Sequence, residues 1–118
     1  MRPNNLILDK SKVFALSIIT LYKYLCTKKR EFVISKQLLR CVTSIGANAK
    51  EASLAQSKRD FIAKLSISLK EAGEAEYWLE LLYKSDYIDN NMFNDYYKMI
   101  DEIIRIITTI LKTARKNL

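Results

Sequence analysis

The stretch from Ser57 to Lys84 reads SKRDFIAKLSISLKEAGEAEYWLELLYK, and it predicts one long amphipathic helix. Ser57 followed three residues later by Asp60 resembles a capping box, with Asp in the place of the usual Glu, so the helix is expected over residues 58–84. Its apolar positions recur at helical spacing. They are Phe61, Leu65, Ser68 or Leu69, Ala72, Ala75, Leu79 and Leu82.

Three further helices are predicted outward from this one. On the N-terminal side we expect helices over about residues 10–27, with Asp9 or Ser11 as N-cap, and 36–54, capped by Ser35. On the C-terminal side, the turn at residues 85–90 precedes a helix over about 91–116. Short connections between four helices of similar length favour one domain over residues 1–118, an all-α, antiparallel up-down-up-down four-helix bundle.

Small residues mark where helices are expected to approach each other closely. The second half of the 36–54 helix contains Ser44, Gly46, Ala47, Ala49, Ala52 and Ser53, so a neighbouring helix is predicted to pack closely there. Gly73 lies inside the 58–84 helix, where glycine costs roughly 1 kcal/mol relative to alanine. That cost suggests that another backbone or a bulky ring packs against Gly73.

The composition excludes much of enzyme chemistry. The 118 residues are 49% hydrophobic and include no histidine, so catalytic triads, imidazole bases and histidine-containing zinc sites are ruled out. Glu71, Glu74, Glu76 and Glu80 could pair as carboxylates, but di-iron sites of helix bundles also need histidine. We therefore predict a protein that is not an enzyme and has no metal or cofactor.

The cysteines and the hydropathy point to the cytoplasm. Cys26 and Cys41 lie in apolar stretches without a C-x-x-C spacing, which is typical of buried free thiols in a reducing compartment. No stretch reaches the about 18 uninterrupted apolar residues of a membrane span, and the N-terminus has no signal-peptide pattern. We expect a cytoplasmic protein with no membrane partner.

The charge distribution favours a polyanionic partner. Twenty Lys and Arg against 13 Asp and Glu give a net charge of +7. In the predicted topology the N-terminus, the turn near residue 56 and the C-terminus share one end, which collects the cations Arg2, Lys10, Lys12, Lys50, Lys58, Arg59, Lys112, Arg115 and Lys116 against Asp9, Glu51 and Asp60. The opposite end carries only +2, from Lys28, Lys29, Arg30, Lys36 and Lys84 against Glu31, Asp86 and Asp89.

Five cations of the basic end are the predicted phosphate contacts for RNA or DNA. They are Lys58, Arg59, Lys112, Arg115 and Lys116. Cations near the end of the last helix complement its dipole, but Lys58 and Arg59 at a helix N-terminus oppose it, which favours a role beyond stability.

The last helix is apolar over more than one face, which favours a homo-oligomer. Met92, Met99 and Ile106 form a seven-residue row beside the main stripe, and we predict that this row is the subunit interface. An alternative function is a protein-binding adaptor whose Tyr- and Ile-rich surface docks a partner. The aromatic residues from Tyr77 to Tyr97 could also stack bases, but aromatics at helical spacing more often belong to a core or an interface.

Residues 44–89 carry a resemblance to a known family. The most specific part is Ser44-Ile45-Gly46-Ala47-Asn48 with Glu51, then Ser57 and Asp60-Phe61, followed by Lys70-Glu71-Ala72 and Tyr77-Trp78-Leu79. This pattern resembles the bacterial four-helix-bundle family of 23S rRNA intervening-sequence proteins. The sequence departs from the commonest form at residues 49–52, which read AKEA where the family has Ile-Ala-Glu-Gly. The resemblance implies ring-like homo-oligomers, pentamers in particular, an association with nucleic acid and no catalytic residue.

The polar residues of this motif have two interpretations. Asn48 and Glu51 could form a ligand or interface site. They could instead tie the interhelical turn together, with either Glu51 accepting hydrogen bonds from free amides of the next helix or Asn48 accepting them from a neighbouring backbone. We favour the structural interpretation for the motif as a whole, which consists of Ser44, Gly46, Asn48, Glu51, Asp60 and Phe61.

Overall fold

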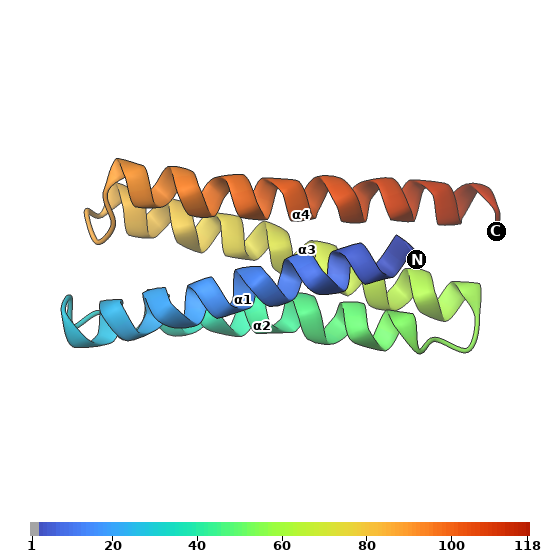
Figure 1. The fold of residues 1–118 in the computed structure, drawn as a ribbon, viewed down its shortest axis with the longest axis horizontal. Coiled ribbons are helices and arrows are strands. Elements are labelled where there is room, and N and C mark those ends of the chain that lie inside the picture. Colours follow the sequence, from blue (N-terminus) through green and yellow to red (C-terminus); the bar gives the residue numbers. More distant parts are fainter. Residues whose placement is uncertain (1–2) are drawn as a thin grey trace.

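Four α-helices form an antiparallel up-down-up-down bundle, as the sequence predicts. The computed structural model describes residues 3–118, with α1 at Pro3–Thr27, α2 at Ile34–Ser53, α3 at Lys58–Lys84 and α4 at Asn90–Lys116. Each helix packs against two neighbours, in the pairs α1–α2, α2–α3, α3–α4 and α1–α4 (Figure 1). The bundle measures 47 × 22 × 20 Å, and the first described turn of α1 and the last turn of α4 lie toward the same end.

Local capping fixes where α3 and α4 begin. The Ser57 hydroxyl accepts a hydrogen bond from the Asp60 N–H at 3.1 Å, which satisfies one of the free amides of the first turn of α3. The observed bounds of α3 coincide with the predicted range. At α4 the Asp89 carboxylate accepts a hydrogen bond from the Met92 N–H at 2.9 Å, and the helix begins one residue earlier than predicted.

Helix α1 is longer than predicted because Ser11 is not its N-cap. The helix begins at Pro3, and Ser11 lies inside it, where its buried hydroxyl donates to the Leu8 carbonyl at 3.1 Å. Ile7 is fully buried, so the core-facing stripe begins before the polar residue Asp9. Because serine is a common N-cap residue, the sequence alone does not distinguish the buried Ser11 from a cap.

Helix α2 is capped by Glu31 and not by Ser35. The buried Glu31 carboxylate accepts hydrogen bonds from the N–H groups of Val33 at 3.0 Å, Ile34 at 2.9 Å and Ser35 at 2.7 Å. Burial by itself would raise the pKa of Glu31, but the backbone donors of Ile34, Ser35 and Val33 outweigh it, so the pKa lies below its ordinary value. The first turn of α2 is therefore stabilised by a charged acceptor supplied from the preceding turn.

The core runs along the bundle axis and draws on all four helices. Its fully buried members include Phe14, Ile18, Leu21 and Leu25 of α1, Leu38, Val42 and Ile45 of α2, Leu65, Leu79 and Leu82 of α3, and Ile100 and Ile107 of α4. Cys41 is buried, Cys26 is half-buried rather than buried, and both are free thiols. Within residues 3–118, no helix is long and apolar enough to cross a membrane.

The two glycines of the chain occupy opposite environments. A Cβ added at Gly46 would lie 3.4 Å from the Ser11 hydroxyl, so α1 approaches α2 closely at this position, as the small residues predict. Gly73 is exposed, and an added Cβ would meet no atom within 4 Å. The expectation that a backbone or ring packs against Gly73 is therefore wrong, since open space lies beside it.

We predict that Gly73→Ala stabilises the protein by about 1 kcal/mol, because alanine is the better helix former and the added methyl group meets no atom. Urea unfolding followed by circular dichroism measures this change. The matched comparison is Gly46→Leu, whose larger side chain has to displace Ser11 and should destabilise the protein. A Gly73→Ala variant no more stable than the parent would contradict the open environment.

The Glu31 cap predicts a defined pH dependence. A carboxylate with a lowered folded-state pKa contributes stability above its unfolded-state value of 4.5, and this contribution is lost as the pH falls through the folded-state value. Glu31→Gln should lower the unfolding free energy at pH 7 by about 1 kcal/mol. The difference from the parent should then shrink below pH 4.5. Exposed Glu80→Gln is the control, and a constant difference between Glu31→Gln and parent over this pH range would contradict the charged cap.

Candidate functional site

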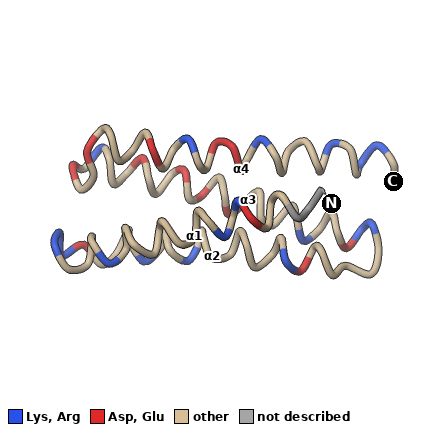
Figure 2. Tube along the Cα trace, in the orientation of Figure 1, with Lys and Arg blue, Asp and Glu red and all other residues tan. Residues whose placement is uncertain are grey.

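Exposed cations surround the end of the bundle where α3 begins and α4 ends. We call this surface the basic pole, formed by Lys50, Lys58, Arg59, Lys112, Arg115 and Lys116, all of them exposed. The Lys58 ammonium donates to the Asn117 carbonyl at 3.3 Å, and the Arg115 guanidinium donates to the Ser66 hydroxyl at 3.3 Å. These contacts bring the first turns of α3 beside the last turns of α4, so all five predicted phosphate contacts lie at the same end (Figure 2).

The basic pole is smaller than the sequence count suggests. Arg2 lies outside the described residues. Because α1 begins at Pro3, Lys10 and Lys12 lie about two turns along the helix, and Lys10 pairs with Glu102 of α4 at 3.1 Å. Glu51, one of the three anions predicted at this end, forms an ion pair with Lys64 at 3.2 Å, so its charge is compensated by a cation outside the basic pole.

The structure also changes the interpretation of Lys58. Its ammonium group contacts a carbonyl at the C-terminal end of α4, where the helix dipole favours positive charge. The unfavourable position at the start of α3 is therefore compensated by α4. Arg59 is exposed, and no hydrogen bond or ion pair in the described part of the chain involves its side chain.

The opposite end of the bundle is divided into a basic and an acidic turn. The turn between α1 and α2 exposes Lys28, Lys29 and Arg30, and the first turn of α2 exposes Lys36, while the segment around the turn between α3 and α4 exposes Asp86, Asp89 and Asp95 (Figure 2). Phe32 and Val33 beside the basic turn are 52% and 72% exposed. The net charge of +2 predicted for this end is the sum of a basic and an acidic segment, so it does not reveal their separation. The basic segment can be seen in the sequence as the cluster Lys28-Lys29-Arg30 followed by Phe32.

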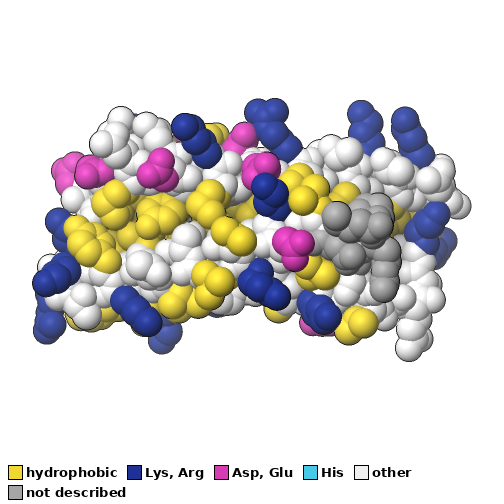
Figure 3. Space-filling model, in the orientation of Figure 1, with side chains coloured by type: hydrophobic (Ala, Val, Ile, Leu, Met, Phe, Trp, Pro, Cys, Tyr) yellow, Lys and Arg dark blue, Asp and Glu magenta, His cyan; other side chains and the backbone are white. Residues whose placement is uncertain are grey.

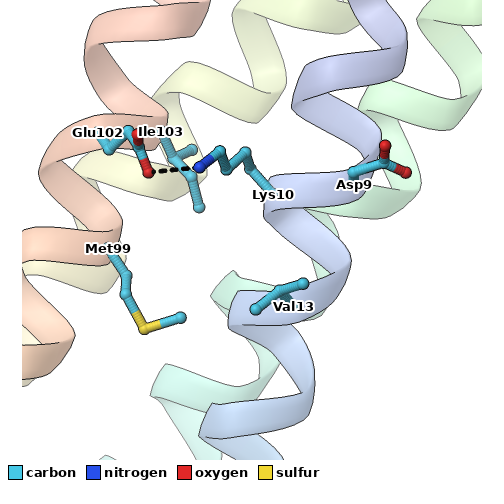
Figure 4. A pocket seen from close by; sticks show the side chains of 6 residues that line it. All are labelled: Asp9, Lys10, Val13, Met99, Glu102 and Ile103. Carbon is cyan, nitrogen blue, oxygen red and sulfur yellow. Dashed lines mark ion pairs between the residues drawn. The ribbon is translucent and has the colours of Figure 1, made fainter.

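The predicted interface row lies along the seam between α4 and α1. Met92, Met99 and Ile106 are half-buried, and the Ser17 hydroxyl of α1 lies 3.8 Å from the Met99 sulfur. A groove of about 400 Å³ opens here, lined by Asp9, Lys10, Val13, Met99, Glu102 and Ile103, with the ion pair between Lys10 and Glu102 crossing it (Figure 4).

Helix α1 contributes the exposed apolar residue Val13 to the same seam, which the sequence analysis did not predict. Val13 is 58% exposed and lines the groove beside Met99, and Leu16, one turn further along α1, is 60% exposed on its outer face. Figure 3 shows a band of hydrophobic side chains along this face, where α1 lies beside α4. The sequence signal for this residue is that Val13 is apolar but lies outside the main apolar stripe of α1.

The polar residues of the family motif make other contacts than those predicted. The Asn48 amide donates to the carbonyl and the hydroxyl of Ser44 at 2.9 and 3.0 Å, within α2 itself, and Glu51 pairs with Lys64 rather than with amides of α3. The polar link between the two helices is instead the buried Ser68 hydroxyl, which donates to the Ile45 carbonyl at 2.8 Å. Phe61 is half-buried against the core.

One cluster has the residue types of a metal site but is organised as an ion pair. Ligand atoms of Cys41, Glu71 and Glu74 lie within 4.8 Å of one another. Arg40 donates to Glu71 at 3.5 Å and to Glu74 at 3.3 Å, so its guanidinium supplies the countercharge between α2 and α3. Burial raises the pKa of the Cys41 thiol to about 11, so the thiol is protonated at neutral pH.

Comparisons with known proteins give a family and a fold. A family model described as "23S rRNA-intervening sequence protein" matches residues 4–109. A solved structure from Bacteroides thetaiotaomicron, described as a protein with unknown function from the S23 ribosomal protein family, is 49% identical. Its TM-score is 0.92, and the match covers 94% of this chain and 99% of that chain. No curated protein matches the chain.

Proposed function

Because the chain belongs to the family of 23S rRNA intervening-sequence proteins, we propose that it is a non-enzymatic, homo-oligomeric bundle that binds RNA or DNA in the bacterial cytoplasm. The observation that carries this proposal is the basic pole, where six exposed cations from α2, α3 and α4 share one end of the bundle. Lys58, Arg59, Lys112, Arg115 and Lys116 are the proposed phosphate contacts.

The mode of binding follows from the kinds of side chain at the pole. Lys and Arg neutralise backbone phosphates and release condensed counterions, so affinity falls steeply with salt. Phosphate contacts position a protein on nucleic acid without reading its sequence. The proposed site therefore predicts weak sequence preference.

The homo-oligomer is proposed to form through the seam between α1 and α4. The half-buried row of Met92, Met99 and Ile106 continues there, at Met99, into the exposed side chain of Val13. Covering this band with a second copy removes apolar surface from water, which drives association. A ring, with a pentamer expected from the family resemblance, would place the basic poles of its subunits on one face and add their affinities through avidity.

The second candidate function is a protein-binding adaptor without direct contact to nucleic acid. The observation that favours it is the exposed pair Phe32 and Val33 at the turn between α1 and α2, far from the basic pole. Exposed apolar residues rimmed by cations are typical of a docking surface. Salt dependence separates the two functions, because adaptor binding through apolar contacts responds weakly to salt.

We predict that the charge-reversal variant Lys58→Glu/Arg59→Glu/Arg115→Glu loses most nucleic-acid affinity, because three proposed phosphate contacts become repulsive. Fluorescence anisotropy with short structured RNA and with duplex DNA across a salt series measures binding. Each lost phosphate contact should reduce the slope of log affinity against log salt by about 1.

The matched control reverses the same number of charges at the other end of the bundle, as Lys28→Glu/Lys29→Glu/Lys36→Glu. This variant has an identical net charge, so general electrostatic attraction falls equally in both. Retained binding in the control and loss in the first variant would support the basic pole. Equal losses, or a folded parent that binds neither nucleic acid at low salt, would refute it.

We predict that Ile106→Lys separates the subunits while leaving the helices intact, because a charge placed on the half-buried row cannot be covered by a second copy. Sedimentation velocity reports the mass, and circular dichroism the helicity. Exposed Thr108→Lys in the same helix is the control. An unfolded Ile106→Lys protein would place Ile106 in the core of the monomer, and an unchanged assembly would place the interface elsewhere.

A further inference from the structure

A second groove lies between α3 and α4, and neither proposed function uses it. Its volume is about 210 Å³, and it is lined by Gly73, Glu76, Tyr77, Glu80, Phe93 and Tyr97. This volume is below the range of pockets that hold drug-sized ligands, and it suits one long side chain.

Aromatic rings and carboxylates face this groove together. Tyr77 is 53% exposed and Tyr97 39%. The rings of Phe93 and Tyr97 are 5.6 Å apart, and Tyr83 stacks on Phe93 at 4.6 Å, so the rings hold one another in place. The faces of aromatic rings attract cations, and two carboxylates beside them strengthen that attraction.

The electrostatic environment of Tyr97 shows that the groove is negatively charged, as its two carboxylates imply. The negative charge of Glu76, followed by burial and the charge of Asp101, raises the pKa of the Tyr97 hydroxyl. The nearby cation Arg105 is engaged by Asp101 at 2.8 Å. In a chain of net charge +7, this groove is a local negative site.

Gly73 gives independent support for an occupant. It lies in the interior of α3, where glycine weakens the helix, yet an added Cβ would touch no atom within 4 Å. The intramolecular packing therefore gives no reason for glycine at this position. A larger side chain would project into the groove that Gly73 lines, so glycine keeps this space open.

We propose that the groove between α3 and α4 binds a lysine or arginine side chain of a basic polypeptide. The aliphatic part of such a side chain lies against Tyr77 and Tyr97 over Gly73, and its charged group meets the carboxylates of Glu76 and Glu80. The proposal is independent of the basic pole and of the seam between α1 and α4, because it uses different residues and the opposite charge.

The test is an NMR titration of the ¹⁵N-labelled full chain with the capped tripeptides Ala-Lys-Ala and Ala-Arg-Ala. Capped Ala-Ala-Ala and Ala-Glu-Ala are the control peptides. Only two glycines are present in the chain, so the Gly73 amide reports the groove while the Gly46 amide, packed near Ser11, is an internal control. We expect saturable shifts of the Gly73 resonance with the cationic peptides alone, at millimolar concentration.

Three variants test whether the cationic peptides bind through the residues of the groove. Glu76→Gln/Glu80→Gln should weaken binding at least tenfold, whereas Asp86→Asn/Asp95→Asn removes the same charge from exposed positions outside both grooves and should leave binding unchanged. Gly73→Leu fills the groove and should abolish binding. In that variant the single indole N–H, from Trp78, replaces the Gly73 reporter, because its ring lies 5.1 Å from that of Tyr77.

Four results would overturn the proposal. They are the absence of Gly73 shifts in the parent, equal shifts at Gly46, equal weakening by the Asp86→Asn/Asp95→Asn control, and a changed oligomeric state of Gly73→Leu in sedimentation velocity. The last result would make a second copy of the chain the occupant. Circular dichroism of each variant confirms that it is folded, so a loss of binding is assigned to the groove.

Discussion

The close packing of α2 against α3 is the constraint on which the rest of the bundle depends. These two helices pack more extensively than any other pair, and small buried residues of both helices, Ala49, Ala52, Ala72 and Ala75, belong to the core. The buried hydrogen bond from Ser68 to the Ile45 carbonyl fixes the register between them. Because both helices are long, this register also determines where α1 and α4 attach and which residues meet at each end.

The surfaces of the molecule follow from that arrangement. With α2 and α3 fixed, α4 returns along α3 and ends beside the first turn of α3, which assembles the basic pole from segments nearly 60 residues apart in sequence. Helix α1 packs on α2 and contacts α4 more sparsely. The apolar seam and the groove beside Met99 are the result of that sparse contact.

Features set by neighbouring residues could be predicted from the sequence, while features set by distant contacts could not. The start of α3 was predictable because the Ser57 cap is local, and the bundle was predictable because the apolar spacing persists over four segments. The start of α1 and the cap of α2 could not be predicted in this way, because Ser11 and Ser35 have the residue type of an N-cap but lie inside helices. Ser11 packs near Gly46, and Ser35 donates its amide N–H to Glu31.

The candidate site shows the same division. The end of the bundle at which the five cations lie followed from topology, but their partners did not: the contact of Lys58 with the last residues of α4 depends on how two helix ends meet. The pairing of Glu51 with Lys64 depends on side-chain conformation and could not be read from spacing. The open space beside Gly73 required the structure, since a helical glycine has the same sequence signature whether it is covered or free.

The sparse contact between α1 and α4 has a consequence for local unfolding. Segments with few buried apolar contacts open with the lowest free energies, independently of global unfolding. Of the four helix pairs, α1 and α4 form the least extensive contact, with one ion pair, Lys10 to Glu102, across their groove. The contact between α1 and α4 is therefore the first to open, while α2 and α3 stay packed against each other, and the amide hydrogens of α1 and α4 exchange with solvent sooner than those of α2 and α3.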